Sequence, residues 1–240
     1  MSFDEAILWE KLGNSRHSPL EGDWLGNVYS PSLSAELRRA LCERIGWLGP
    51  QGWTILKSLI NQYGSKTEMV YAAGLCHQIE AKDWLISELE NDQDLRLDVI
   101  QALACWGAVI TDQLLLSVLR QPSQSMRLAG IELLSFKAHQ LNDEKLLAIT
   151  EDLLEDWREP IPLALIRLLQ RRDGASITKR LASMATNSSQ NIANAAIQAL
   201  GCIQTQESQS ALGSLANTLP EGQSKNLVNK QLKQQYKQYL

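Results

Sequence analysis

Apolar residues recur three and four positions apart along most of the chain, and this spacing places them on one face of an α-helix. The clearest run covers residues 191–203, where small and apolar side chains alternate with amides. Residues 96–107 repeat its shape, and both segments contain the pattern Ile-Gln-Ala-Leu-x-Cys. The first expectation is therefore a chain built from a repeated helical unit.

Four further segments fit this shape more loosely and define the length of the unit. They lie at residues 37–46, 71–75, 126–134 and 163–169. One apolar residue near the end of each copy is taken as equivalent: Ile45, Leu75, Leu103, Leu134, Leu169 and Leu200. A second apolar stretch follows every copy, so the sequence predicts six helix pairs of about 30 residues each.

The predicted fold class is all-α, a right-handed α-solenoid in which neighbouring helix pairs bury one another's apolar faces. No alternating run of β-branched residues is long enough to form a strand. We expect residues 1–33 to form an N-terminal helix and an irregular loop, and residues 34–218 the array. Residues 219–240 are predicted to form a C-terminal capping helix, because the last unit of a solenoid has no neighbour.

Composition and charge limit the classes of partner that the chain is expected to bind. The 240 residues are 44% hydrophobic and 21% charged, which is ordinary for a folded soluble protein. The formal net charge is −4, so no overall field attracts phosphate and we expect no nucleic acid as a partner. The first residues lack a basic start and an apolar core, so we expect no secretion signal, no transmembrane segment and a cytoplasmic location.

The cysteines and histidines do not have the spacing of metal ligands. The cysteines are Cys42, Cys76, Cys105 and Cys202, and the histidines are His17, His77 and His139. We expect the cysteines to be reduced, small and buried, and the histidines to be structural or solvated. No metal site is predicted, and no catalytic residue can be named.

The last unit carries Ala-x-x-Ala-Leu-Gly-x-Ile at residues 196–203. In this pattern the chain resembles the short HEAT-like repeats of the phycobilisome bilin lyase family, over about residues 32–218. The resemblance implies about six HEAT-like helix pairs. It also implies kinship with cyanobacterial factors that attach, remove or rearrange bilins on phycobiliproteins, some of whose relatives serve iron–sulfur cluster assembly.

Two classes of function agree with such an array. The first is a non-catalytic interaction scaffold or assembly factor without a cofactor, which binds another protein on its concave face. The resemblance suggests a phycobiliprotein subunit or a second HEAT-like subunit as that partner. The second class, also implied by the resemblance, is a subunit of a bilin lyase or a bilin-handling chaperone that takes phycocyanobilin, or an iron–sulfur assembly partner. A helical-repeat DNA glycosylase is disfavoured by the negative net charge.

The interaction surface is expected along one row of the second helices, which usually line the concave face of a curved array. The repeat register aligns Thr54, Trp84 and Leu114. Trp84 and Leu114 would form an apolar patch of the kind that concentrates binding energy. Trp24 and Tyr29 in the early loop are further candidates for partner binding. The alternative is that these side chains pack between helices or pin the loop to them.

An acidic stretch precedes a basic one in the second half of the chain. The acidic residues are Glu151, Asp152, Glu155, Asp156 and Glu159, and the basic residues are Arg167, Arg171, Arg172, Lys179 and Arg180. We expect these charges to compensate one another across the loops of adjacent units. The alternative is a phosphate-binding patch.

Overall fold

The computed structural model describes residues 4–15, 20–90 and 96–237. Contacts divide the chain into two compact units, Met1–Ile110 and Thr111–Leu240. The helices of the first unit are α1 (Glu5–Asn14), α2 (Gly22–Val28), α3 (Ala35–Gly46), α4 (Pro50–Tyr63), α5 (Thr67–Leu75), α6 (Ile79–Glu90), α7 (Leu97–Ala102) and the 3-10 helix η1 (Ala104–Val109).

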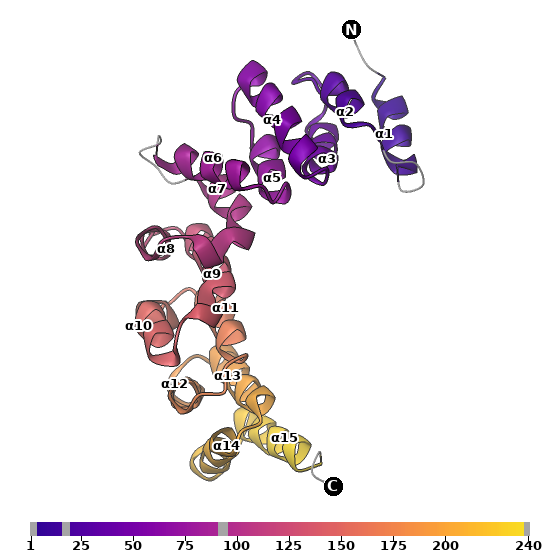
Figure 1. The fold of residues 1–240 in the computed structure, drawn as a ribbon. Helices are drawn as coiled ribbons and strands as arrows, with labels where there is room; N and C mark the ends of the chain where they lie inside the picture. Colours follow the sequence, from indigo (N-terminus) through magenta and orange to yellow (C-terminus); the bar gives the residue numbers. More distant parts are fainter. Residues whose placement is uncertain (1–3, 16–19, 91–95, 238–240) are drawn as a thin grey trace. The chain divides into compact units, whose positions relative to one another are not determined.

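The helices of the second unit are α8 (Asp112–Leu119), α9 (Gln124–Lys137), the 3-10 helix η2 (Ala138–Gln140), α10 (Asp143–Leu154), α11 (Pro160–Leu169), α12 (Ala175–Asn187), α13 (Gln190–Ile203), α14 (Gln206–Thr218) and α15 (Gln223–Lys237). The described residues contain no strand, and the prediction of an all-α fold of stacked helix pairs is confirmed (Figure 1). Among these helices, none has the length and apolar character needed to cross a membrane.

Local sequence signals explain where several helices begin. Thr111, Asn142 and Thr205 are N-caps, and the side-chain oxygen of each accepts a hydrogen bond from the backbone N–H three residues later. Pro50 and Pro160 begin α4 and α11, where the missing N–H of proline leaves no hydrogen bond unmade.

In the first unit the first helix of each pair packs on the first helix of the next, α3 on α5 and α5 on α7. Two glycines allow this close approach. A Cβ on Gly46 would lie 2.8 Å from the Ala72 carbonyl oxygen, and one on Gly74 would lie 2.4 Å from the Ala102 carbonyl oxygen. Both distances are shorter than van der Waals contact, so a larger residue at either position would force the helices apart.

The segment between residues 13 and 33 differs from the irregular loop that the sequence predicts, because it contains α2. This helix packs on α4, while α1 packs on α3, so α1 and α2 form an additional helix pair. A Cβ on Gly22 or Gly26 would lie within 3 Å of the Ile55 side chain. The glycines that allow α2 to approach α4 also lower its helix propensity, which is why the helical pattern is weak there.

In the second unit the helices form two rows (Figure 1). One row consists of α9, α11, α13 and α15. In the other row, α10 contacts α12 and α12 contacts α14. α15 lies against α13 and α14. The buried Gln235 amide of α15 donates hydrogen bonds to the backbone carbonyls of Leu200 and Gly201 at 3.3 and 3.1 Å, so α15 satisfies carbonyl groups near the end of α13.

The predicted equivalent positions form the core, with one exception. Side chains at five of them have no exposed surface: Ile45, Leu103, Leu134, Leu169 and Leu200. Leu75 is only half-buried, and its neighbour Ala73 is fully buried instead. Gly74 occupies the close contact with Ala102 of α7, and the Leu75 Cβ lies beside Gly46 of α3.

Candidate functional site

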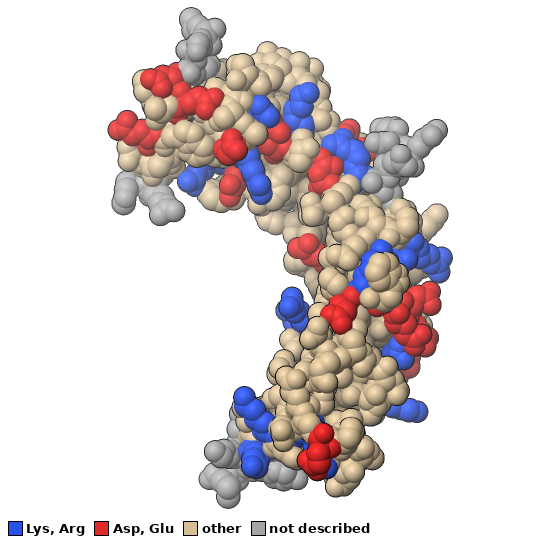
Figure 2. All heavy atoms as spheres, turned by 180° about the vertical axis from the view of Figure 1, so that it is seen from behind, with Lys and Arg blue, Asp and Glu red and all other residues tan. Residues whose placement is uncertain are grey.

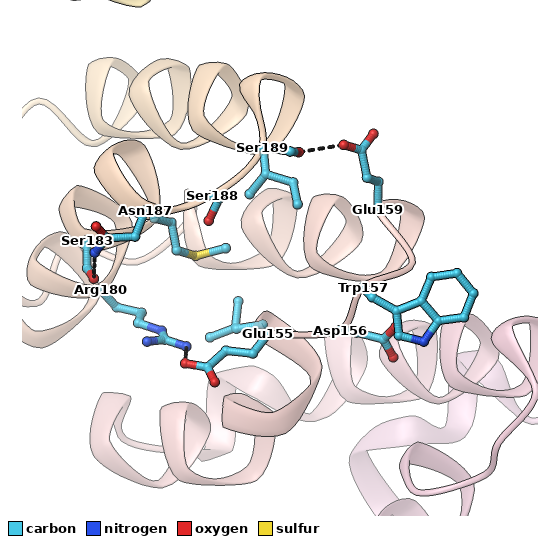
Figure 3. Close-up of a pocket in the computed structure, with 12 residues that line it drawn as sticks. Glu155, Asp156, Trp157, Glu159, Arg180, Ser183, Asn187, Ser188 and Ser189 are labelled. Atoms are coloured by element: carbon cyan, nitrogen blue, oxygen red, sulfur yellow. Dashed lines mark hydrogen bonds and ion pairs between the residues drawn. The ribbon is translucent and has the colours of Figure 1, made fainter. Parts of the chain in front are cut away.

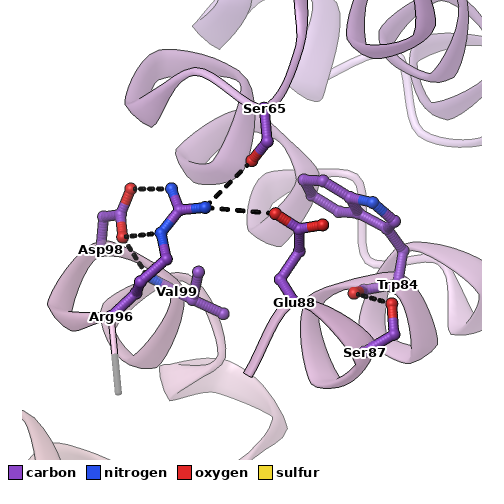
Figure 4. Close-up of polar contacts among 7 residues, drawn as sticks. All are labelled: Ser65, Trp84, Ser87, Glu88, Arg96, Asp98 and Val99. Atoms are coloured by element: carbon purple, nitrogen blue, oxygen red, sulfur yellow. Dashed lines mark hydrogen bonds and ion pairs between the residues drawn. The ribbon is translucent and has the colours of Figure 1, made fainter. Parts of the chain in front are cut away.

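Trp84 is half-buried on α6 of the first unit. Its ring packs against Trp53 of α4, with 5.7 Å between the ring centroids and 44° between the planes, a tilted arrangement that aromatic pairs favour. The Ser87 hydroxyl donates a hydrogen bond to the Trp84 carbonyl oxygen at 2.7 Å (Figure 4). Trp84 therefore contributes to the packing of α4 against α6 and presents only part of its surface.

One turn after Trp84 on α6, Glu88 binds Arg96, which connects three segments (Figure 4). Its guanidinium binds both carboxylate oxygens of Asp98 at 3.2 and 2.8 Å, and one nitrogen reaches Glu88 and Ser65, each at 3.2 Å. Burial raises the pKa of Asp98, but the hydrogen bonds and charge of Arg96 outweigh it and hold that pKa below its usual value. This network fixes the start of α7 against α6.

The two candidates in the early segment have different environments. Trp24 on α2 is half-buried, and the Lys11 ammonium lies 3.9 Å from its ring centroid. Tyr29 is 2% exposed, and its hydroxyl donates a hydrogen bond to Glu68 of α5 at 2.9 Å. Burial and the Glu68 carboxylate raise the pKa of Tyr29. Tyr29 thus pins the segment to α5, as in the alternative interpretation, and its ring is not part of the surface.

Leu114 lies on α8 in the second unit, whereas Trp84 belongs to the first. Leu114 is half-buried and Thr54 is exposed. Their assignment to one partner-binding row stays a prediction.

A surface cavity of about 420 Å³ lies beside the turn that joins α10 to α11 (Figure 3), which is within the size range of ligand and side-chain pockets. Apolar, neutral polar and charged side chains all line it. The apolar ones are Leu154, Met184 and Ile192, the neutral polar ones Ser183, Asn187, Ser188 and Ser189, and the charged ones Glu155, Asp156, Glu159 and Arg180. Trp157 also borders this cavity.

Trp157 is 86% exposed, more than any other large hydrophobic residue in the described ranges. Its ring projects outward from the turn, away from Glu155 and Arg180 (Figure 3). The Arg158 guanidinium lies 5.7 Å from the ring centroid. A tryptophan in this position offers a large apolar surface with a polar N–H, the combination that is enriched at protein interfaces.

The buried side chain of Asp156 fixes the conformation of the turn. Its side chain is 2% exposed, and one carboxylate oxygen accepts hydrogen bonds from the Arg158 backbone N–H and Nε, both at 2.9 Å. The other oxygen accepts from Arg158 Nη2 at 2.7 Å and from Arg127 Nη1 at 2.6 Å. The Arg158 hydrogen bonds, aided by Arg127, lower the pKa of Asp156 to about 2 despite its burial.

Negative charge is concentrated in the segment that contains α10 and this turn. Residues 143–159 contain seven acidic and two basic side chains, a net charge of −5, compared with −4 for the whole chain. Acidic side chains gather on the face of the second unit that carries α10 (Figure 2). Glu155 pairs with Arg180 at 3.1 Å, which is a charge pair of the kind that the sequence predicts between adjacent units. Glu151 and Asp152 are exposed.

Glu159 accepts hydrogen bonds from the Asn191 amide at 3.0 Å and from the Ser189 hydroxyl at 2.5 Å. These neutral donors, Asn191 first, lower the pKa of Glu159 without cancelling its charge. The cavity is therefore bordered by a carboxylate that stays ionised at neutral pH.

All four cysteines are free, but the expectation that all are buried is wrong. Cys42 and Cys76 are buried, whereas Cys105 is half-buried and Cys202 exposed. Cys202 follows the buried Leu200 and Gly201 on α13, and the 3.6-residue period turns it away from the core. Cys105 lies in η1, where its sulfur is 3.7 Å from Nδ1 of His77.

Among the described residues, no group of three or more histidine, cysteine or carboxylate side chains is arranged to hold a metal ion. His77 and His139 are exposed, and His17 lies outside the described residues. Burial raises the pKa of Cys76 to about 12, so this thiol stays protonated at neutral pH.

No known family model matches the chain, and neither does the sequence of any curated protein. Two of the solved structures that are similar to it have 15% identity and cover most of the chain. The complex of CpcE and CpcF of phycocyanin lyase from Nostoc sp. PCC7120 has a TM-score of 0.49 and 15% identity, covering 90% of this chain and 95% of that chain. Human deoxyhypusine hydroxylase in complex with glycerol has a TM-score of 0.40 and 15% identity, covering 95% and 99%. A phycocyanin lyase is thus among the similar structures, and neither similarity speaks to the activity of this chain.

For the acidic stretch the sequence predicts a set of compensating charges, and Trp157 is not among the candidate residues. A signal was present, because a lone tryptophan stands between carboxylates and Pro160 and outside the helical apolar spacing. Its exposure depends on the contact of Asp156 with Arg127, which lies 29 residues earlier. A pattern of local spacing does not contain that contact.

Proposed function

We propose that this chain is a non-catalytic scaffold or assembly factor that binds another protein, with Trp157 and the adjacent cavity as its main contact. The observation that carries this proposal is the 86% exposure of Trp157 on a turn fixed by Asp156. An exposed tryptophan gains much from burial against a partner, at roughly 25 cal/mol per Å² of apolar surface.

The rigidity of the turn adds to this argument. A side chain on a mobile loop loses conformational freedom when it binds, whereas a turn that is already ordered loses less. Asp156 receives four hydrogen bonds that tie the turn to itself and to α9. The contact surface is therefore formed before a partner arrives.

The test is quantitative co-purification from a native extract, with the bound protein identified by mass spectrometry. Trp157→Ala should reduce the yield of the partner about tenfold or more, since a central tryptophan at an interface contributes roughly 2 kcal/mol or more. Trp47→Ala is the matched control, because Trp47 is also exposed, at 56%, and also lies beside an arginine. Equal yields from the wild type and Trp157→Ala would refute the proposal.

The sequence resemblance supports a second function, in which the chain acts as a subunit of a phycobiliprotein bilin lyase or as a bilin-handling chaperone. The Ala-x-x-Ala-Leu-Gly-x-Ile pattern at residues 196–203 is the observation behind it. Phycocyanobilin is then the expected ligand. Titration of the purified chain with phycocyanobilin should give a shifted and intensified absorbance band if this function applies, and an unchanged spectrum if it does not.

A further inference from the structure

We propose that the cavity beside Trp157 binds an arginine or lysine side chain in an extended segment of a partner protein, while the neighbouring residues of that segment cover the indole ring. This inference rests on the proposed function, because it specifies the chemistry of the partner at the same site. Three features of the site support it: the charge around the cavity, the distribution of its lining, and the accessible ring.

The charge favours a cation. Among the cavity-lining residues, three are carboxylates and one is an arginine. Arg180 pairs with Glu155 and Arg158 with Asp156, whereas Glu159 is held by neutral donors alone. Asp156 also pairs with Arg127, so Glu159 is the carboxylate of the cavity lining that is left for a cation to pair with. An acidic side chain placed in the cavity would be repelled by the Glu159 carboxylate.

The lining suits a long side chain with a charged end. The apolar part of the cavity is formed by Leu154, Met184 and Ile192, and carboxylates lie beside the turn. Arginine and lysine place their methylene groups on apolar surface and keep the charged group among polar partners. A purely apolar side chain would leave the carboxylate of Glu159 without an ionic partner, and a short cation would not cover the apolar surface.

The indole ring provides the second contact. Arg158 lies 5.7 Å from the ring centroid, yet the residue remains 86% exposed. The ring is therefore accessible to a partner, and a tryptophan ring attracts cations as well as apolar groups. A segment with one basic residue in the cavity places its neighbouring residues over this ring, since an extended chain advances by about 3.4 Å per residue.

Selection from a library of random peptides of about twelve residues, displayed on phage, tests the proposal on the full chain. Peptides that bind the wild type but not Trp157→Ala are isolated and sequenced. The proposal predicts that these peptides are enriched in arginine and lysine relative to the library. Their affinity should fall as the salt concentration rises from about 50 to about 300 mM, because ions screen exposed charges.

Individual peptides are then measured against two double variants that remove the same number of charges. Glu155→Gln with Glu159→Gln should weaken the binding of an arginine peptide about fivefold or more, since the ionic contact with Glu159 is lost and the Arg180 guanidinium beside the cavity loses its partner Glu155. Glu10→Gln with Glu207→Gln is the matched control, because both residues are exposed and lie on α1 and α14, outside the cavity lining. Helical circular dichroism confirms that each variant is folded.

The two ideas fail in different ways. Peptides that depend on Trp157 but are neutral or acidic, or that bind both double variants equally well, would overturn the cationic partner and leave the proposed scaffold function standing. A selection that yields no Trp157-dependent peptide would overturn the cationic partner. If Trp157→Ala also retains the co-purified protein, the scaffold function fails as well.

Discussion

The carboxylate of Asp156 should be the most sensitive point of the α10–α11 turn. Its side chain is 2% exposed and ion-paired with Arg127 and Arg158, whose side chains are 22% and 15% exposed. Removing one partner of a fully buried ion pair costs about 3–5 kcal/mol. Because both guanidinium groups reach some solvent, we expect Asp156→Ala to lower the free energy of unfolding by about 2–4 kcal/mol, after discounting for solvent screening.

Asp156→Asn separates charge from shape. The amide keeps one acceptor oxygen, so we expect a smaller loss of about 1–3 kcal/mol at pH 7. The folded-state pKa of Asp156 is lowered from 3.8 to about 2. Its ionic stabilisation is therefore fully present above the unfolded-state value and is lost as the pH falls from about 4 to about 2. The difference between the wild type and Asp156→Asn should narrow over this interval.

Urea unfolding of the wild type, the two Asp156 variants and Asp152→Asn at several pH values provides the assay. Asp152 is exposed, and its substitution should change the free energy of unfolding by no more than about 0.5 kcal/mol. Since the chain has two compact units, a transition with two phases should show the loss in one phase only. A loss below about 0.5 kcal/mol for Asp156→Ala, or pH profiles that stay parallel below pH 4, would refute this account of the turn.

Three further predictions concern helix packing and the exposure of the cysteines. Gly74→Ala should lower the free energy of unfolding, measured by thermal unfolding, by about 1–3 kcal/mol, because its Cβ would meet the Ala102 carbonyl. Gly13 has open space around it, so Gly13→Ala should leave the free energy of unfolding unchanged or raise it. A double-mutant cycle of Trp53 and Trp84 should give a coupling free energy of about 0.5–1.5 kcal/mol in unfolding. A coupling free energy near zero would contradict the packing of the two rings. Alkylation without reductant should label two cysteines in the native chain and all four after unfolding, whereas a mass consistent with a disulfide would contradict the free thiols.

The repeated helices were predictable because each one records its buried face in the spacing of its own residues. Ile45 and Leu200 illustrate this, since both occupy the predicted position and both are fully buried. α2 was missed for the opposite reason. Its packing against α4 needs Gly22 and Gly26, and these residues weaken the local helical signal that a sequence pattern depends on.

The candidate site was harder to predict because its geometry arises from distant contacts. Tyr29 was a candidate for the surface, but its hydroxyl finds Glu68, 39 residues later, and its ring is buried. Trp157 was not a candidate, yet Arg127 and Arg158 fix the turn from which it projects. Residue type indicates Tyr29 but not Trp157, because only the fold decides which ring faces solvent.

The proposed scaffold function can be tested most directly by photo-crosslinking in cells. Benzoylphenylalanine in place of Trp157 should give a dominant adduct with one protein, whereas the same group in place of Trp47, an exposed tryptophan of the other unit, should not give that adduct. An absence of protein adducts at position 157, or the same set of adducts at both positions, would contradict the assignment of the turn between α10 and α11 as the partner-binding site.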